Sequence, residues 1–260
     1  MLSTHQLIHG DVFDVLPSLD HYACCILDPP DGIGLKYAGV KDVKRSQYHD
    51  WFASLMTKVI PHAGITWVSF NSIWDLMVKH WAYDYSLLHP DIEIKPFYQH
   101  YTFFQCNNND CAPAQRPILR FRKSDAPIYP DQIRIPSWRL LNGDKRANPR
   151  GKTPGDVWSI PRVTGNSKQR RAWHPTQLNE ELIERAILLS TAEGDTVLDL
   201  FSGTGTVIRV CKRIGRHSVS VELSKAYCQR IAEEHSLEIL PNHLTKNTKT
   251  EVFMLEAQRA

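Results

Sequence analysis

Two short apolar runs that lie far apart in the sequence each end in a loop of distinctive composition. Residues 23–27 lead into Asp28-Pro29-Pro30-Asp31, and residues 196–200 lead into Phe201-Ser202-Gly203-Thr204-Gly205-Thr206. We interpret each run as a buried strand that ends at its loop. Because ligands collect outside the carboxyl ends of the strands in an open α/β sheet, the two loops can meet over a single site.

The order of the other predicted elements favours the same fold class. Strands and helices alternate along most of the chain, which predicts an α/β fold with a mostly parallel sheet and helices on both faces. Residues 251–255 are a candidate edge strand. The other strands are expected at 5–9, 23–27, 65–70, 98–105, 117–122, 196–200 and 218–222, and the helices at 12–18, 48–59, 72–83, 179–189, 207–214 and 225–235.

The glycine loop has the features of a nucleoside-binding site. Gly203 and Gly205 lack Cβ atoms, so the chain can turn tightly there and approach a ligand closely. The helix that follows offers unpaired N–H groups to a carboxylate. Glu222 ends the next strand, where an acid commonly binds the two hydroxyls of a ribose. A lone Gly-x-Gly occurs in many tight turns, but strand, glycine loop, helix, strand and Glu in succession favour a nucleoside cofactor.

Positive charge is concentrated in one part of the chain. The whole chain carries a net charge of +3, whereas residues 116–171 contain fourteen Lys or Arg and four Asp, a net charge of +10. The regular pattern of elements also breaks down from 123 to 171, as expected of a long functional loop or small insertion. A basic segment in an acidic remainder is typical of a polyanion-binding surface, and the aromatic residues among its cations suit contact with bases. The alternative is a basic loop that is merely solvated.

Several motifs together give the chain a resemblance to a known family. Gly10-Asp11, Asp28-Pro29-Pro30, His174-Pro175-Thr176-Gln177, Gly194-Asp195 and the loop from Phe201 to Gly205 follow one another. This set resembles the amino-group DNA methyltransferases that use S-adenosylmethionine, in the arrangement (the beta class) where the catalytic motif precedes the cofactor motif. The resemblance covers most of the chain. It implies a Rossmann-like methyltransferase fold with a seven-stranded, mixed, mostly parallel sheet.

The resemblance also implies roles for parts of the chain. Residues 1–122 and 172–260 would form the catalytic domain, and residues 123–171 a basic target-recognition region. S-adenosylmethionine would be the cofactor, with Glu222 at its ribose, Asp11 at its adenine and Thr176 near its methionine carboxylate. Further cofactor contacts would come from Asp199, Phe201, Ser202, Gly203, Thr204 and Gly205. DNA would be the partner, and the residues expected to bind it are Arg134, Arg139, Lys145, Arg146, Arg150, Lys168, Arg170 and Arg171.

The chemistry expected of the Asp-Pro-Pro loop follows from its residues. The exocyclic amine of adenine or cytosine is a poor nucleophile because its lone pair is delocalised into the ring. The Asp28 carboxylate and the Pro29 carbonyl can accept its two N–H bonds and direct the lone pair toward a sulfonium methyl group, while Pro30 stiffens the loop. Such a base cannot be reached inside a duplex, so base flipping is implied. The alternative is an ordinary turn at the end of a strand.

One residue of the catalytic loop departs from the family pattern. An aromatic residue that stacks on the flipped base usually follows the two prolines, whereas this chain has Asp31. Stacking of a base on an aromatic side chain is worth about 1–3 kcal/mol, so either another residue replaces it or activity should suffer. Tyr37 is the first candidate for stacking on the target base, and Trp51 and Phe70 are others.

Several functions remain open at this point. The favoured one is transfer of a methyl group to the N6 amine of adenine in DNA, because an acidic first motif residue leans that way; the alternative is the N4 amine of cytosine. An RNA or protein substrate is less favoured, since Asn would then be expected at position 28. A different class is a DNA-binding protein impaired in catalysis, with Asp31 as the sign of decay.

Composition limits what else the chain can be. With 260 residues, 42% of them hydrophobic and 23% charged, it belongs to the globular class. It has no run of about 18 apolar residues and no N-terminal leader pattern, so we expect no membrane contact and a cytoplasmic location in a prokaryotic cell or a phage-infected host. Cys106 and Cys111 lack a second pair at zinc spacing, so no metal is expected. Homodimer formation is left open.

Overall fold

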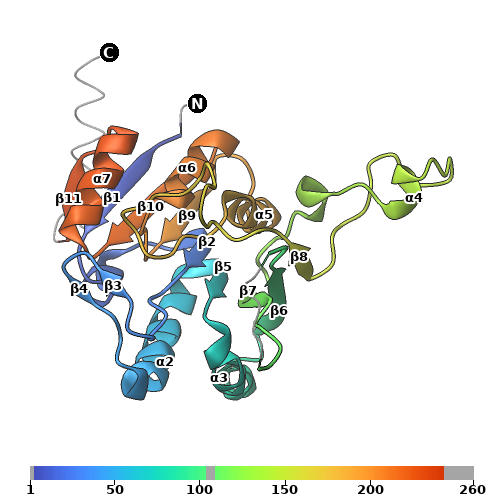
Figure 1. Cartoon of the computed structure of the whole chain (residues 1–260). Coiled ribbons are helices and arrows are strands. Elements are labelled where there is room, and N and C mark those ends of the chain that lie inside the picture. Colours follow the sequence, from blue (N-terminus) through green and yellow to red (C-terminus); the bar gives the residue numbers. More distant parts are fainter. Residues whose placement is uncertain (1–2, 104–108, 243–260) are drawn as a thin grey trace, which may run out of the picture.

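The chain forms one large sheet with helices on both faces and a small separate hairpin (Figure 1). The computed structural model describes residues 3–103 and 109–242. The strands are β1 (His5–His9), β2 (Tyr22–Leu27), β3 (Lys36–Tyr37), β4 (Val40–Lys41), β5 (Ala63–Ser69), β6 (Ile92–His100), β7 (Gln115–Lys123), β8 (Val157–Ser159), β9 (Thr196–Asp199), β10 (His217–Glu222) and β11 (Ile239–Pro241). The helices are α1 (Val12–Val15), α2 (Tyr48–Val59), α3 (Asp75–Leu88), α4 (Trp138–Leu141), α5 (Glu180–Ser190), α6 (Thr206–Ile214) and α7 (Lys225–His235).

The sheet is mixed but mostly parallel, in the order β11-β1-β10-β9-β2-β5-β7-β6-β8. Among the described strands of this sheet, β7 alone runs against its neighbours, because it pairs antiparallel with both β5 and β6. The predicted fold class is therefore confirmed, with nine strands in place of seven. The two edge strands, β8 and β11, are three residues long, and runs this short leave no periodic pattern in a sequence.

Most predicted elements are found, and one strand is misplaced. Helices α2 and α7 begin and end at the predicted residues. The strand predicted at 98–105 is β6, which starts earlier at Ile92 and ends at His100. It contains Lys95 and Pro96, which argue against a strand in the sequence, but nine residue pairs with β7 outweigh that local signal. Residues 104–105 and the candidate strand at 251–255 lie outside the described residues.

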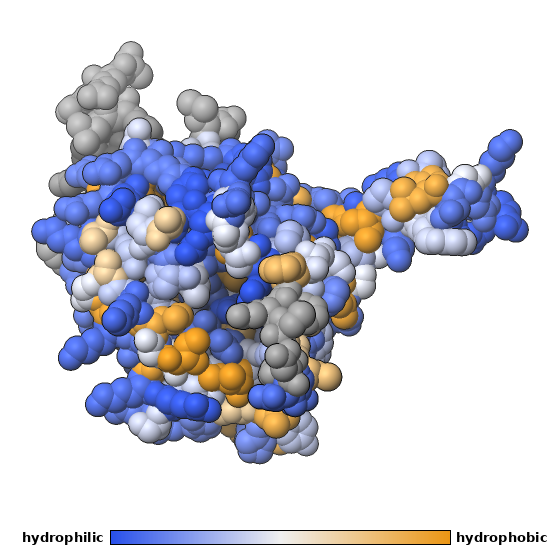
Figure 2. Space-filling model, in the orientation of Figure 1, coloured by the Kyte–Doolittle hydropathy of each residue, from blue (hydrophilic) through white to orange (hydrophobic). Residues whose placement is uncertain are grey.

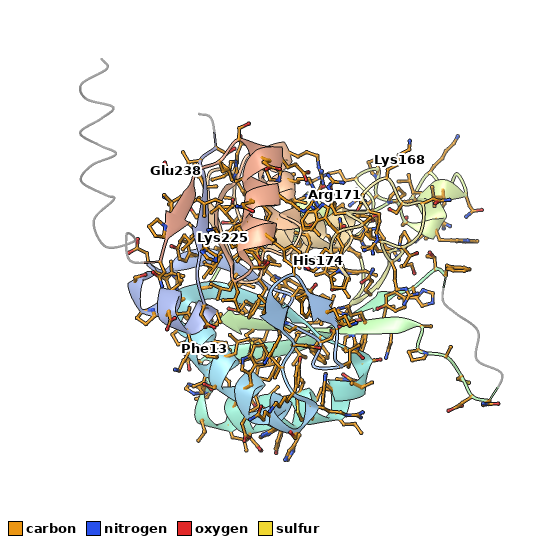
Figure 3. The ribbon with its side chains drawn as sticks, turned by 60° about the vertical axis from the view of Figure 1, so that its left-hand side comes forward. Phe13, Lys168, Arg171, His174, Lys225 and Glu238 are labelled. Atoms are coloured by element: carbon orange, nitrogen blue, oxygen red, sulfur yellow. The ribbon has the colours of Figure 1, made fainter. Side chains whose placement is uncertain are left out.

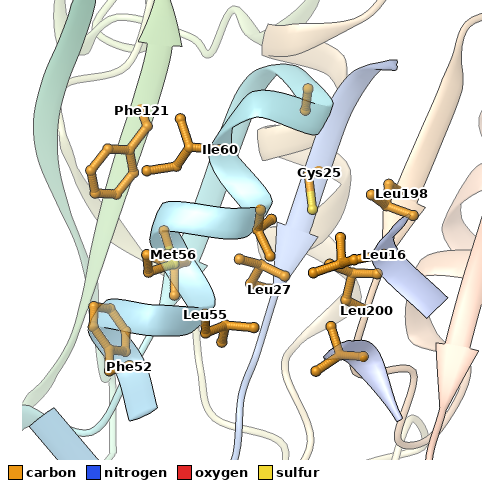
Figure 4. Close-up of a cluster of buried hydrophobic side chains, with 14 of the residues drawn as sticks. Leu16, Cys25, Leu27, Phe52, Leu55, Met56, Ile60, Phe121, Leu198 and Leu200 are labelled. Atoms are coloured by element: carbon orange, nitrogen blue, oxygen red, sulfur yellow. The ribbon is translucent and has the colours of Figure 1, made fainter. Parts of the chain in front are cut away.

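The alternation of side chains along β2 joins the two halves of the core. Cys25 and Leu27 point into the layer formed by α1, α2 and α3, whereas Cys24 and Ile26 point into the layer formed by α5 and α6. Figure 4 shows Leu27 and Leu55 packed between α2 and the sheet. A strand that is apolar on both sides must lie at the centre of a covered sheet, and this burial fixes where the loop after β2 emerges.

The order in which the chain adds strands to the sheet changes direction between β2 and β9. From β2 the chain continues through α2 to β5, and from β9 it continues through α6 to β10 on the other side. The two strands pair in parallel, with Ile26 opposite Asp199. Their loops therefore leave the same edge of the sheet side by side, at the position where open α/β sheets bind ligands.

Residues 135–152 leave the body of the molecule as a projecting arm, which carries α4 (Figure 1). Ile135 and Lys152 close its base with two backbone hydrogen bonds, of 2.9 and 2.8 Å. The rest of the predicted basic region, 123–171, lies against the body. The Tyr129 N–H donates to the Leu189 carbonyl, and β8 extends the sheet beside β6. The arm is thus the part of this region that is separate from the sheet.

Candidate active site

A cavity of about 260 Å³ lies at the carboxyl ends of β2 and β9. Most residues predicted to act in catalysis or cofactor binding line it. Asp31 and Gly205 do not line it, although they belong to the same two loops. The predicted residues along its wall are Asp11, Asp28, Pro29, Pro30, Tyr37, Thr176, Asp199, Phe201, Ser202, Gly203, Thr204 and Glu222.

The glycine loop turns in a conformation that ordinary side chains rarely adopt. Gly203 has a φ of +49° and Gly205 one of +70°. A Cβ on Gly203 would lie 3.2 Å from Nε2 of His174, so this loop and the segment before α5 are in close contact. The His174 ring also approaches the Thr176 carbonyl through Nδ1. Burial lowers the pKa of His174, so its ring is neutral near pH 7.

Two carboxylates form the acidic floor of the cavity. Glu222 accepts hydrogen bonds from the backbone N–H groups of Gly203 at 2.8 Å and Ser224 at 2.7 Å. Asp199 accepts from the Phe201 N–H at 3.2 Å and the Ser202 hydroxyl at 3.2 Å. Burial raises the pKa of Asp199 and of Glu222 to about 7. Each Glu222 oxygen keeps a lone pair that a ligand hydroxyl can use, and the pair of acids suits a cationic ligand.

The Asp28 carboxylate is held through one of its two oxygens. Oδ1 accepts hydrogen bonds from the Ser69 hydroxyl at 2.5 Å and from the Arg116 guanidinium at 2.8 Å. Oδ2 receives no hydrogen bond from the residues that the structure describes, and the side chain is 22% exposed. Pro29 and Pro30 also face the cavity. The loop therefore presents a carboxylate whose position is fixed through one oxygen. The other oxygen is available to accept a hydrogen bond from an N–H group of a substrate.

The segment after the catalytic loop folds over the cavity and is tied down at two points. The Asp42 carboxylate accepts hydrogen bonds from four consecutive backbone N–H groups, those of Gly32, Ile33, Gly34 and Leu35. In the hairpin of β3 and β4, Ala38 accepts a hydrogen bond from the Ser224 hydroxyl at 2.5 Å and donates to the Tyr227 hydroxyl at 3.0 Å. This hairpin thereby links the catalytic loop to the glutamate side of the cavity.

Of the three aromatic residues considered for base stacking, two face the cavity. Tyr37 lines it, with its ring 5.8 Å from that of His174. Trp51 also lines it, with its ring 6.2 Å from that of Phe201. Phe70 is fully buried in the core, so the suggestion that it stacks on a base is wrong.

The eight predicted DNA-binding cations differ in their surroundings. Arg139 and Arg146 pair with Asp144 within the arm, and Arg134 and Arg150 pair with Asp131 at its base. Lys145 and Lys168 are exposed, and Arg170 is half-buried. Arg171 makes two short hydrogen bonds to Glu234 of α7, so part of its function is structural. Figure 3 labels Lys168, Arg171 and His174, which lie along one loop.

Three contributors to the site were not predicted from the sequence. His174 belongs to the motif His174-Pro175-Thr176-Gln177, in which only Thr176 was expected to contact the cofactor. Tyr227 lies in the first turn of α7, shortly after Glu222. Ser224, which caps the start of this helix, is the sequence signal that could have placed Tyr227 beside the site. Arg116 gave no local signal, because only the pairing of β7 with β5 brings it to Asp28. In the described part of the chain there is no group of three His, Cys, Asp or Glu side chains placed to hold a metal ion.

The sequence matches a family model described as DNA methylase over residues 22–234. The chain belongs to this N6/N4 DNA methylase family. The Type II methyltransferase M.HpaI of Haemophilus parainfluenzae is 31% identical over 243 residues, which cover 88% of this chain and 73% of that protein. The DNA adenine methyltransferase YhdJ of Escherichia coli (strain K12) is 25% identical over 256 residues, covering 85% and 79% of the two chains.

Solved structures of DNA methyltransferases have the same fold. The PvuII DNA methyltransferase, which is cytosine-N4-specific, superposes with a TM-score of 0.67 at 18% identity, over 97% of this chain and 92% of its own. The M1.HpyAVI–SAM complex gives a TM-score of 0.61 at 20% identity, over 90% and 100% of the two chains. At these identities the likeness concerns the fold. No helix among residues 3–103 and 109–242 has the length and hydropathy needed to cross a membrane.

Proposed function

We propose that this DNA methylase transfers a methyl group from S-adenosylmethionine to the N6 amine of adenine in DNA. The observation that supports this most directly is the position of Asp28. Asp28 lines the same cavity as the glycine loop and Glu222, which come from the other half of the chain, and Arg116 engages only its Oδ1. An acceptor for an amino group and a nucleoside site share one cavity.

The cavity residues fit the proposed cofactor. S-adenosylmethionine supplies a methyl group on a cationic sulfonium. Asp199 and Glu222 offer negative charge, and the free lone pairs of Glu222 suit a pair of ribose hydroxyls. Phe201 and Leu223 add apolar wall suited to an adenine ring, and Asp11 lies beside them in the lining. The M1.HpyAVI–SAM complex, which shares the fold, supports this choice.

Asp28 and Pro29 would bind and orient the amino group of the target base. Oδ2 of Asp28 and the Pro29 carbonyl each accept one N–H bond, which turns the nitrogen lone pair toward the methyl carbon. S-adenosylmethionine would supply the methyl carbon, and its sulfur would keep the electron pair of the broken sulfur–carbon bond and leave as a thioether. Asp28 would accept one N–H proton from the methylated, cationic amine and pass it to water. Holding the two reacting atoms near contact distance supplies much of the rate.

Tyr37 is the side chain best placed to stack on the flipped base. It lines the cavity together with Asp28 and Pro30, and its ring lies 5.8 Å from that of His174. The Asp42 carboxylate and the Ala38 bonds hold the hairpin that carries it. Tyr37 would thereby replace the aromatic residue that the family has in the position of Asp31.

Adenine is favoured over cytosine by two observations. The catalytic motif begins with an acid, Asp28, and the relative YhdJ is a DNA adenine methyltransferase. The relative M.HpaI is a Type II methyltransferase, and on this likeness we also propose a place in restriction-modification.

The test is expression of the chain in a host that has no DNA methylation of its own, followed by mass spectrometry of the nucleosides from its genomic DNA. N6-methyladenine supports the proposal. N4-methylcytosine retains the chemistry but changes the target base. If neither product forms while the purified protein binds S-adenosylmethionine, DNA methylation by this chain is contradicted, and RNA and protein become the substrates to assay.

A further inference from the structure

A buried arginine joins the two aspartates of the catalytic loop. Nη2 of Arg116 lies 2.8 Å from Oδ1 of Asp28 and 3.1 Å from Oδ1 of Asp31. The side chains are 12%, 22% and 6% exposed, so solvent screens these contacts only weakly. Burial alone would lower the pKa of Arg116, but Asp28 and Asp31 raise it above its ordinary value. The arginine is therefore charged at any pH at which the protein is folded.

Asp31 is built into this cluster from several sides. Its carbonyl accepts a hydrogen bond from the Trp74 indole at 2.7 Å, and its carboxylate accepts one from Arg116 at 3.1 Å. It does not line the cavity, so it cannot take the place of a stacking residue. A residue left over from decay would be expected at the surface without partners. Asp31 is instead buried, and it accepts hydrogen bonds from Trp74 and Arg116.

The charges of the cluster matter because methyl transfer creates positive charge at the target nitrogen. Arg116 and Asp28 by themselves form a neutral pair, which would place a buried cation near that nitrogen. Asp31 adds a second negative charge, so the three groups carry a net charge of −1. A fixed environment with this charge stabilises the cation that develops, while the hydrogen bond from Arg116 orients Asp28.

We propose that Arg116 and Asp31 are a matched pair of positioning residues: Arg116 fixes the Asp28 carboxylate for the target amine, and Asp31 cancels the charge that Arg116 brings. The inference rests on the proposed function, because its main measure is methyl transfer. It also explains why the position after the two prolines is acidic in this chain.

The experiment is a double-mutant cycle with Asp31→Asn, Arg116→Gln and both together. Each single variant should lower kcat by about ten- to hundredfold, because Asp28 is displaced or its charge is offset. The double variant restores a net charge of −1, so it should recover at least about fivefold relative to the product of the two single effects. The Kd for S-adenosylmethionine and the KM for DNA should stay near those of the wild-type protein.

The pH profile of kcat separates positioning from a merely structural role. In Arg116→Gln the two carboxylates face each other without a cation, so the acidic limb should move to higher pH. In Asp31→Asn the arginine charge is uncancelled, and the limb should move to lower pH. Shifts in the same direction, wild-type kcat in both single variants, or independent effects in the double variant would overturn the proposal.

A second buried arginine on the same strand serves as the control. Arg120 lies further along β7 than Arg116 and contacts Glu93 at 2.7 Å, away from the catalytic loop. Arg120→Gln and Glu93→Gln should lower thermal stability without moving the pH profile. If Arg116→Gln does not fold, Arg116→Lys is the variant to use. It keeps the charge but cannot bridge the two aspartates as the guanidinium does, so it should lower kcat and leave the pH profile unchanged.

Failure of the inference can be distinguished from failure of the proposed function. If the wild-type protein transfers no methyl group, the proposed function is contradicted, but the coupling between Arg116 and Asp31 can still be measured by thermal unfolding of the same variants.

Discussion

The cavity and the arm are stabilised in different ways. Cavity residues are held by partners that are distant in the sequence, as in the contacts of Arg116 with Asp28 and of Tyr227 with Ala38. The arm holds its shape through near neighbours, such as Arg139 and Asp144, and through the two backbone bonds at its base. The geometry of the cavity therefore depends on the whole fold, whereas the arm can vary without disturbing it.

The two regions also differ in what they leave exposed. Nearly all of the cavity wall is buried or half-buried, whereas Trp138 and Leu141 of α4 are 75% and 72% exposed. Figure 2 shows apolar side chains on the projecting arm, among hydrophilic ones. We infer that the cavity determines the chemistry and that the arm contributes to DNA binding. Variants in one region should leave the property of the other unchanged.

The largest effect is expected at Asp28. Asp28→Asn should lower the rate of methyl transfer by about 10²–10⁴-fold, because the N–H acceptor loses its charge and its proton-accepting role. Binding of S-adenosylmethionine and of DNA should change little. Asp50→Asn on the exposed surface of α2 is the matched control. Transfer at the wild-type rate in the Asp28 variant would mean that the cavity does not determine the chemistry as proposed.

Tyr37 should matter for its ring and not for its hydroxyl. Tyr37→Leu should reduce kcat/KM for DNA by about 1–3 kcal/mol of stacking free energy, which corresponds to roughly 5- to 150-fold. Tyr37→Phe keeps the ring and should lose little. Fluorescence of 2-aminopurine at the target position reports base flipping, and an equal signal in the Leu variant and the wild-type protein would assign stacking to Trp51 instead.

Because of the two acids of the cavity floor, the stability of the free protein should fall with rising pH, whereas its affinity for the cofactor should rise. The pKa of Asp199 and Glu222 is about 7 in the folded protein because burial disfavours the charged form, whereas the unfolded chain ionises near pH 4. Between these values the folded state holds more protons, so the stability of the free protein should fall as pH rises from about 4 to 7, and then level off.

A cationic cofactor favours the ionised acids, so its affinity should rise over the same interval. The rise should approach about tenfold per pH unit for each acid, and binding should release protons in calorimetry carried out in two buffers. Asp199→Asn removes one of the two acids and should flatten the profile. An affinity that does not vary between about pH 5.5 and about pH 7.5, where these acids titrate, would contradict their proposed use.

Trp138 tests whether the arm contacts bases. Trp138→Ala should not change thermal stability, because the side chain is 75% exposed, but it should weaken DNA binding by about 1 kcal/mol or more if the ring stacks or inserts. Cofactor affinity should be the same as in the wild-type protein. Unchanged DNA affinity, measured by fluorescence anisotropy, would restrict the role of the arm to its charges.

The smallest effect is expected from a single cation of the arm. Lys145→Glu should weaken DNA binding a few-fold, and the slope of log K against log salt should fall by about 0.9 for each phosphate that the variant no longer neutralises. Lys58→Glu, which makes the same charge change on α2, is the control. Equally weakened binding in the two variants would show that net charge alone, and not the arm, sets the affinity.

The sequence predicted those parts of the site that depend on neighbours in the chain. The glycine loop and the Asp-Pro-Pro loop each follow a strand directly, so periodicity and composition located them. Arg116 could not be found in this way. It reaches Asp28 only through the register that sets Ser69 opposite Ile118 in β5 and β7, and no local pattern specifies an antiparallel partner.

For the basic region, too, the sequence predicted the composition but not the contacts between distant residues. Its charge was evident from composition, but charge does not reveal which cations are engaged by acids such as Glu234 and Asp144. Nor did the sequence divide the region into an arm and a part that packs on the sheet. That division depends on the pairing of Ile135 with Lys152 and on the place of β8 beside β6.

Strands β1 and β11 open and close the described chain, yet they are hydrogen-bonded neighbours, with Leu7 opposite Ile239. Because the two strands are parallel, a crossover linker of about a dozen residues or more could join them, and new ends could be cut at Gly143 in the arm, where an added Cβ would meet no atom within 4 Å. In such a circular permutant the glycine loop would precede the catalytic loop, and the same strands would still bring the two together. The order of the two motifs in the gene is a matter of ancestry, which the geometry of the cavity does not constrain.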